Sequence, residues 1–167
     1  MPGVPAQPAV PAEPGPAGRT RPAEPAGPAR RTVRLPFDRM AVPVARQTLV
    51  SDLAARDLPP EVIAEAESVV AELVGNAVRH ASPLPDGSVR VHWQARDGVV
   101  EVEVSDGGGP TRPAARPQAQ LATAGRGLRI VRSLAHEWGV VDGSATPSPG
   151  GRTVWASVGG PSRRRAW

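Results

Sequence analysis

The sequence predicts an α+β domain built as a two-layer sandwich, with a mixed, mostly antiparallel sheet and about three helices on one face. Three observations lead to this fold class. Helical patterns come as two, then one, among strand patterns, which is typical of α+β proteins. Two neighbouring strand patterns are joined by Arg96-Asp97-Gly98, a hairpin turn. The chain has 167 residues, enough for one domain but too few for two comfortable ones.

The first half of the domain is predicted to hold an edge strand and two helices. Residues 32–36 read as a short strand, which must lie at a sheet edge because Pro36 has no N–H to donate. Residues 42–56 have apolar side chains at helical spacing. A second helix begins at Pro60, followed by Glu61 at its positive end, and runs to about residue 81. The predicted inward residues are Val42, Ala45, Leu49, Val50 and Leu53 in the first helix and Ile63, Ala66, Val70, Leu73 and Ala77 in the second.

The second half is predicted to hold a hairpin, a long loop, a third helix and two strands. The hairpin has one apolar face, formed by Val89, Val91, Trp93, Val100, Val102 and Val104. Residues 107–124 form a long Gly/Pro/Ala/Arg loop, which inside a compact domain is usually a functional lid or disordered. A helix over 128–138 follows, with Leu128, Val131, Leu134 and Ala135 inward. A strand starts at 139–141, and the last strand covers 153–158.

Composition places this domain at residues 32–158. Residues 1–31 are mostly Pro, Ala and Gly and are expected to be a disordered tail. Residues 159–167 form a basic C-terminal tail. The net charge of +4 resides in these tails, because residues 32–162 carry thirteen arginines against fourteen acidic residues. Nucleic acid is therefore not an expected partner. Without a membrane-length apolar run, a secretory signal or any cysteine, a cytoplasmic protein is expected.

The second helix carries a polar stripe beside its apolar face. Glu72, Asn76 and His80 are spaced i, i+4, i+8, which places them within about 80° of one another. An amide oxygen such as that of Asn76 suits Mg²⁺, and a carboxylate one turn earlier can accept a proton from an attacking hydroxyl. Arg79 can reach phosphates with its forked donors. The alternative is a solvated helix edge that happens to carry polar residues.

Two glycine-rich segments follow the hairpin. Asp106 ends a strand and leads into three glycines, where a buried carboxylate could accept a hydrogen bond from an exocyclic amine such as adenine N6; the alternative is an ordinary turn. Gly125-Arg126-Gly127-Leu128 opens the third helix and exposes amide groups to an anion, or is only a helix start. No Gly-x-x-x-x-Gly-Lys occurs, so a P-loop is excluded. His92 and His136 are expected to be structural or solvated, and three of the tryptophans to be core or rim.

These segments, in this order, resemble the GHKL superfamily of gyrases, Hsp-type chaperones, histidine kinases and mismatch-repair proteins. The stretch 72–80 looks like its N-box, Asp106-Gly-Gly108-Gly like its first glycine box, and 125–128 like its second. Gly150-Gly-Arg-Thr153 looks like the last adenine-side element, in which a threonine helps to hold the base. The resemblance covers residues 32–158 and is nearest to the stand-alone anti-sigma-factor serine/threonine kinases of actinomycetes.

The resemblance implies a Bergerat-type ATP-binding fold, with ATP and Mg²⁺ as cofactors. The resemblance implies that Asn76 binds Mg²⁺, that Glu72 is the catalytic base and that Asp106 recognises adenine. The remaining nucleotide-side residues it implies are Arg79, His80, Gly108, Gly125, Arg126, Gly127, Leu128 and Thr153. Pro110 departs from the family pattern, because it stands where the first glycine box often continues with glycine.

The resemblance also implies a function and partners. The leading hypothesis is an ATP-dependent kinase that phosphorylates a serine or threonine of a small antagonist protein and also binds a sigma factor. The alternative is a nucleotide-binding regulator that does not turn ATP over and binds a partner protein in an ATP-dependent way. A homodimer could form through the edge strand, and neither a membrane nor a nucleic acid is an expected partner.

Overall fold

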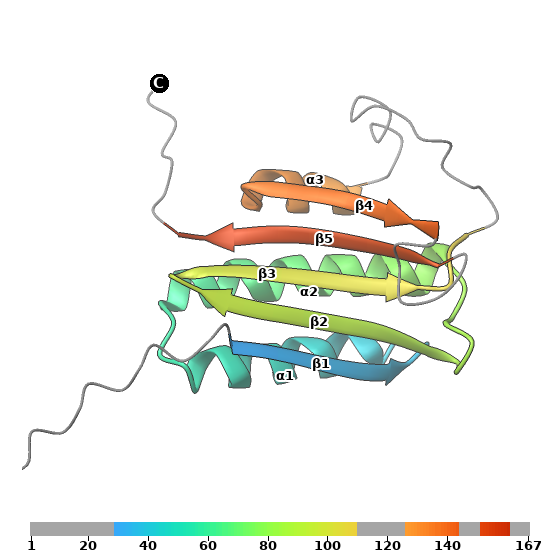
Figure 1. Ribbon diagram of the computed structural model, residues 1–167, viewed down its shortest axis with the longest axis horizontal. Helices are drawn as coiled ribbons and strands as arrows, with labels where there is room; N and C mark the ends of the chain where they lie inside the picture. Colours follow the sequence, from blue (N-terminus) through green and yellow to red (C-terminus); the bar gives the residue numbers. More distant parts are fainter. Residues whose placement is uncertain (1–28, 110–125, 144–150, 161–167) are drawn as a thin grey trace, which may run out of the picture.

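The computed structural model of the chain describes residues 29–109, 126–143 and 151–160. In this part of the chain the elements run in the order β1 (Ala29–Pro36), α1 (Ala41–Ala54), α2 (Pro60–His80), β2 (Ser88–Arg96), β3 (Val99–Asp106), α3 (Arg126–Leu134), β4 (Glu137–Asp142) and β5 (Arg152–Gly159). The five strands form one open sheet, and the three helices cover one of its faces (Figure 1). The predicted α+β class and two-layer arrangement are confirmed.

The sheet has the strand order β1-β2-β3-β5-β4, and every neighbouring pair is antiparallel. The predicted parallel component of a mixed sheet is thus not found in the described strands. β1 lies at one edge, as Pro36 requires. It begins at Ala29, so residues 29–31, which we expected to belong to the N-terminal tail, are part of the sheet. The rest of that expected tail and residues 161–167 lie outside the described residues.

The core lies between the helices and the valine-rich face of the sheet. Val89, Val91 and Trp93 of β2 and Val100, Val102 and Val104 of β3 are all buried, as their alternation predicts. Asp97 and Gly98 between the strands both have positive φ, 52° and 77°, as a tight hairpin turn demands. The opposite face carries polar side chains; on it Thr32 and His92 share a hydrogen bond of 2.7 Å.

α2 is the central helix and is buried more widely than its predicted stripe. Val62, Val69 and Val74 are buried in addition to the predicted residues, whereas Ile63 is only half-buried. The reason is that α2 contacts α1 on one flank and α3 on the other while resting on β3 and β5. The helical spacing of apolar residues predicts a single contact surface. α2 has three, against α1, against α3 and against the sheet.

The third helix is shorter than predicted. α3 ends at Leu134, and Trp138, which we expected at its C-terminal end, lies in β4. His136 is therefore not helical: its N–H donates to the carbonyl of Ser157 on β5 at 2.8 Å. Strand pairing takes over because β4 can satisfy its backbone groups against β5, which helical periodicity in one segment does not reveal.

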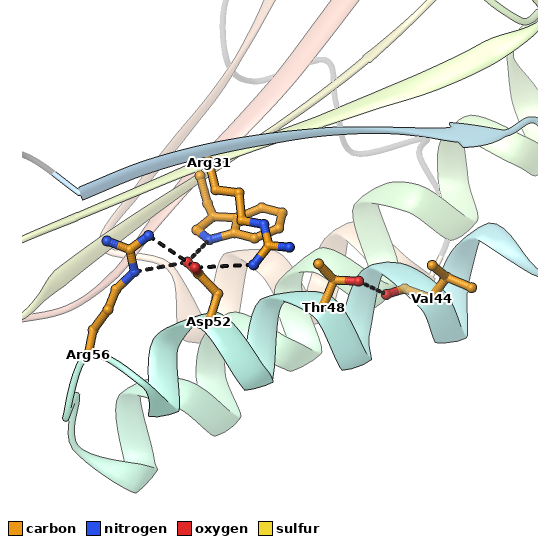
Figure 2. Close-up of polar contacts among 6 residues, drawn as sticks. Arg31, Val44, Thr48, Asp52 and Arg56 are labelled. Carbon is orange, nitrogen blue, oxygen red and sulfur yellow. Dashed lines mark hydrogen bonds and ion pairs between the residues drawn. The ribbon is translucent and has the colours of Figure 1, made fainter.

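A partly exposed ion cluster centred on Asp52 joins β1, α1 and β2 (Figure 2). Asp52 accepts hydrogen bonds from Arg56 Nε and Nη2 at 2.9 and 3.0 Å, from Trp93 Nε1 at 2.8 Å and from Arg31 Nη1 at 3.3 Å. The Arg31 guanidinium also lies 5.9 Å from the centroid of the Trp93 ring. Burial alone would raise the pKa of Asp52, but the hydrogen bonds from Arg56, Trp93 and Arg31 outweigh it and hold the pKa below its ordinary value of 3.8.

We expect Asp52→Asn to lower the free energy of unfolding by about 1–3 kcal/mol, because it removes a charged acceptor shared by three donors. Asp57→Asn is the matched control: Asp57 is exposed and its positive φ of 55° suits asparagine. Because the folded pKa of Asp52 is lowered, its contribution is full above pH 3.8 and declines as the pH falls below it. Urea unfolding at neutral and acidic pH checks both statements; equal stability of the two variants at neutral pH would contradict them.

Candidate functional site

The predicted polar stripe of α2 forms a hydrogen-bonded cluster. Glu72 and Asn76 are half-buried, and Arg79 donates from Nη2 to both, at 3.2 Å to Glu72 Oε1 and 3.0 Å to Asn76 Oδ1. The side chain of Arg79 is 57% exposed and that of Glu72 17%. His80, the last residue of the helix, is exposed. The two oxygens predicted to handle a cation and a proton therefore converge on one positively charged nitrogen.

Backbone hydrogen bonds connect the segment that follows α2 to the segment that follows β3. The N–H of Gly107 donates to the carbonyl of Ser82, and the N–H of Ser82 donates to the carbonyl of Gly108, both at 2.8 Å. A Cβ at Gly109 would lie 3.3 Å from the carbonyl oxygen of His80. In Figure 1 the end of β3, the end of α2 and the start of β5 gather at one end of the molecule. The two sequence segments therefore lie next to each other.

The first glycine of this segment is required by the protein's own backbone. A Cβ at Gly107 would lie 2.1 Å from the carbonyl oxygen of Pro83, which no side chain tolerates. Gly108 has φ of +82°, the left-handed region that glycine favours. Its N–H donates to Asp106 Oδ1 at 2.7 Å. The glycines therefore secure the junction with α2 and aim a donor at Asp106, in addition to the open approach that the sequence suggested.

Asp106 faces the helix layer. It continues the alternation of Val100, Val102 and Val104, whose side chains face the helices, and it is 3% exposed. Its row in the sheet continues through Arg152 of β5 to Asp142 of β4. Arg152 Nε donates to Asp142 Oδ1 at 3.0 Å.

The pKa of Asp106 is raised above its ordinary value of 3.8, mainly because burial disfavours the charged carboxylate. The hydrogen bond from Gly108 and the charge of Arg152 oppose this, and the negative charge of Asp142 adds to it. The site therefore holds a carboxylate that is short of compensating charge within the protein. Such a group gains from a ligand that donates a hydrogen bond to it.

Thr153 does not share this surface. It pairs with Ser105, one residue before Asp106, so its side chain points to the opposite face of the sheet. Its hydroxyl lies 2.8 Å from that of Ser105, and both residues are buried. The register therefore argues against the role that the resemblance implied for Thr153. The β5 residue beside Asp106 is Arg152.

A comparison with protein families matches residues 35–158 to the histidine kinase-like ATPase domain. The chain belongs to this family. The ATPase domain implies that it binds ATP, and the predicted superfamily is confirmed. No curated protein was found to match the chain. In the described part of this ATPase domain, none of the helices has the length and apolar character needed to cross a membrane.

The second glycine box of the histidine kinase-like domain is described only in part. α3 begins at Arg126, so the expected helix start is present, but Gly125 lies outside the described residues. Arg126, Gly127 and Leu128 are placed as helical backbone. The 110–125 portion of the expected lid also lies outside the described residues. The phosphate-side roles of residues 125–128 stay predictions.

Sequence reasoning missed Ser105, Arg152 and Asp142. The alternation of β3 already signals that Asp106 points inward, but it does not say which side chains stand beside it. That depends on the register between β3, β5 and β4, and those strands are separated in the chain by α3 and by the loops around it. Arg152 and Asp142 are recognisable only once the three strands are aligned.

We expect Gly107→Ala to destabilise the ATPase domain by about 1–3 kcal/mol, because the new Cβ would force the Pro83 backbone away. Gly109→Ala is the matched control two residues later, since its Cβ would meet a carbonyl oxygen only at 3.3 Å. Thermal unfolding compares the two, and amide exchange at Ser82 reports on the junction. Equal stability of both variants, with Ser82 protected in each, would refute the role of Gly107.

Proposed function

We propose that this protein is an ATP- and Mg²⁺-dependent serine/threonine kinase that phosphorylates a small antagonist protein and also binds a sigma factor. The observation that carries the kinase assignment is the convergence of Glu72 Oε1 and Asn76 Oδ1 on one cationic nitrogen. A carboxylate oxygen to accept a proton and an amide oxygen to bind a divalent cation are the groups that phosphoryl transfer needs beside a nucleotide.

Asp106 supplies the adenine side of the proposed site. Its ionised carboxylate offers about four acceptor positions, of which the Gly108 N–H uses one at Oδ1. The exocyclic amine of adenine can donate to the carboxylate, which offsets part of its burial. Guanine carries a carbonyl oxygen at the corresponding ring position and would face the carboxylate with an acceptor. This contrast favours adenine nucleotides.

Asn76 and Glu72 fit a divalent cation. Both oxygens already lie within hydrogen-bond distance of a positively charged group, and an amide plus a carboxylate matches the one or two protein ligands that Mg²⁺ usually takes beside phosphate oxygens. When bound, Mg²⁺ would neutralise charge on the phosphates. Asn76 would hold it, with Glu72 close by.

Glu72 is the proposed base. It would accept the proton of the substrate serine hydroxyl as that oxygen bonds to the γ-phosphorus and the bond to the β-phosphate oxygen breaks, which leaves ADP. Arg79 and the start of α3 would bind the phosphates. The antagonist, the sigma factor and a homodimer through the outer edge of β1 are parts of the proposal that rest on the resemblance to anti-sigma-factor kinases. The proposed cytoplasmic location rests on the amino-acid sequence alone.

A second candidate function is a nucleotide-binding regulator that does not turn ATP over. One contact favours it: the guanidinium of Arg79 is paired with Glu72 at 3.2 Å. The carboxylate oxygen Glu72 Oε1 already accepts a hydrogen bond from this guanidinium, so in this arrangement it is occupied and does not face a substrate hydroxyl alone. In this case the same site would bind ATP and set the affinity for a partner protein.

We expect Glu72→Gln to reduce phosphate transfer from labelled ATP to a candidate antagonist by about 10²–10⁴-fold, because the amide cannot accept the proton. ATP affinity should change little, since the side chain keeps its shape. Glu67→Gln is the matched control on the same helix, where Glu67 pairs with Arg46. If wild type and Glu72→Gln bind ATP but transfer label equally poorly, the regulator without turnover replaces the kinase.

We expect ATP affinity to fall on acidification at a pH above the ordinary aspartate range, because protonated Asp106 loses acceptor capacity. Arg152→Gln should move this loss to higher pH by removing a positive neighbour, and Asp142→Asn should move it to lower pH. Because the folded pKa is raised, ionisation of Asp106 lowers stability as the pH rises from 3.8 through the folded value. Calorimetric titrations with ATP from about pH 4 to 8 measure the pH at which the wild type and the two variants lose affinity. Identical pH profiles for the three proteins would contradict the role of Asp106.

A further inference from the structure

The guanidinium of Arg79 lies back along α2, although the side chain is 57% exposed. Arg79 follows Asn76 by three residues and Glu72 by seven, so all three share one side of the helix. Long helical side chains point toward the helix N-terminus, which is the direction of both acceptors. One nitrogen, Nη2, donates to both oxygens at 3.0 and 3.2 Å. The Arg79 guanidinium therefore contacts both Glu72, the proposed base, and the Asn76 oxygen that is proposed to bind Mg²⁺.

Gly75 provides the space for this arrangement. A Cβ at Gly75 would lie 3.2 Å from Arg79 Nη1, 3.4 Å from Nη2 and 3.5 Å from Cζ, and these are its three nearest atoms. Glycine in a helix interior lowers stability by roughly 0.5–1 kcal/mol relative to alanine. All three of these nearest atoms belong to the Arg79 guanidinium, so a side chain at position 75 would crowd that group first.

We propose that Arg79 is an internal counter-ion that couples divalent-cation binding to nucleotide binding, and that Gly75 is the residue that lets it reach its two acceptors. The proposal rests on the proposed function and concerns how the same site is loaded. In the nucleotide-free protein Arg79 holds the oxygens of Glu72 and Asn76. A cation that uses Asn76 Oδ1 must displace the guanidinium, whose positive charge also repels it.

The nucleotide removes this obstacle. A triphosphate offers Arg79 anionic oxygens to which its fork of donors binds more strongly than to one carboxylate and one amide. When the guanidinium moves to the phosphates, Asn76 is released for the cation and Glu72 for its role as base. Coupling between two ligands is reciprocal, so ATP raises the affinity for the cation as much as the cation raises that for ATP. Arg79 is thus a positioning residue that keeps the base paired until ATP arrives.

The test measures Mn²⁺ binding to the full chain without nucleotide, by paramagnetic broadening of the Asn76 side-chain amide signals. We expect weak binding to the wild type, and affinities about two- to threefold higher in Gly75→Ala and about fivefold higher in Arg79→Gln. Ser68→Ala, an exposed change on the same helix, controls for helix propensity. Arg46→Gln, on α1, controls for the loss of a positive charge. Both controls should match the wild type.

A parallel titration with ATP and Mg²⁺ separates the two claims. Gly75→Ala should bind ATP at least as well as the wild type, because Arg79 is retained, whereas Arg79→Gln should bind it more weakly. Unchanged Mn²⁺ affinity in Gly75→Ala, or an equal rise in Arg46→Gln, would overturn the counter-ion proposal. If no variant binds ATP, the proposed function fails, while the Mn²⁺ series still decides whether Arg79 competes with a cation.

Discussion

The structure depends on helix α2, which both packs in the core and carries the polar cluster of the candidate site. One side of this helix is apolar and rests on β3 and β5, and the neighbouring side carries Glu72, Asn76 and Arg79. The core contact fixes the helix rotation, so packing alone determines where the polar stripe points. The hydrogen bonds between Ser82 and Gly107–Gly108 then fix its axial position against β3. The site inherits its geometry from the core instead of from a flexible loop.

Two aspartates in the helix–sheet layer have pKa values shifted in opposite directions. Asp52 is surrounded by donors from Arg31, Arg56 and Trp93, and its pKa is lowered. Asp106 is buried, accepts from the backbone of Gly108, and has a raised pKa. A saturated carboxylate stabilises the fold and has little to offer a ligand. An under-compensated one opposes folding and gains on binding, which is the expected behaviour of a recognition residue.

The sequence alone predicted the structure where the repeat of a single helix or strand determines which side chains are buried or adjacent. The valine alternation of β2 and β3 predicted their buried face and carried Asp106 to the inside, and the i, i+4 spacing placed Glu72 beside Asn76. The sequence did not predict the features that depend on how strands distant in the chain pair with one another. The end of α3 before His136, the position of Thr153 on the far face and the approach of Arg152 to Asp106 all follow from the register of β5. No local pattern encodes that register.

The ion pairs Arg56–Asp52 and Arg79–Glu72 differ in the way that their proposed roles require. Arg56 binds Asp52 through two nitrogens, and that carboxylate is also held by Trp93, so moving Arg56 would break a network. Arg79 divides one nitrogen between Glu72 and Asn76, and it is 57% exposed where Arg56 is 27%. An exposed pair of this kind is worth about 1 kcal/mol or less. That is strong enough to order the side chain and weak enough for a triphosphate to displace it.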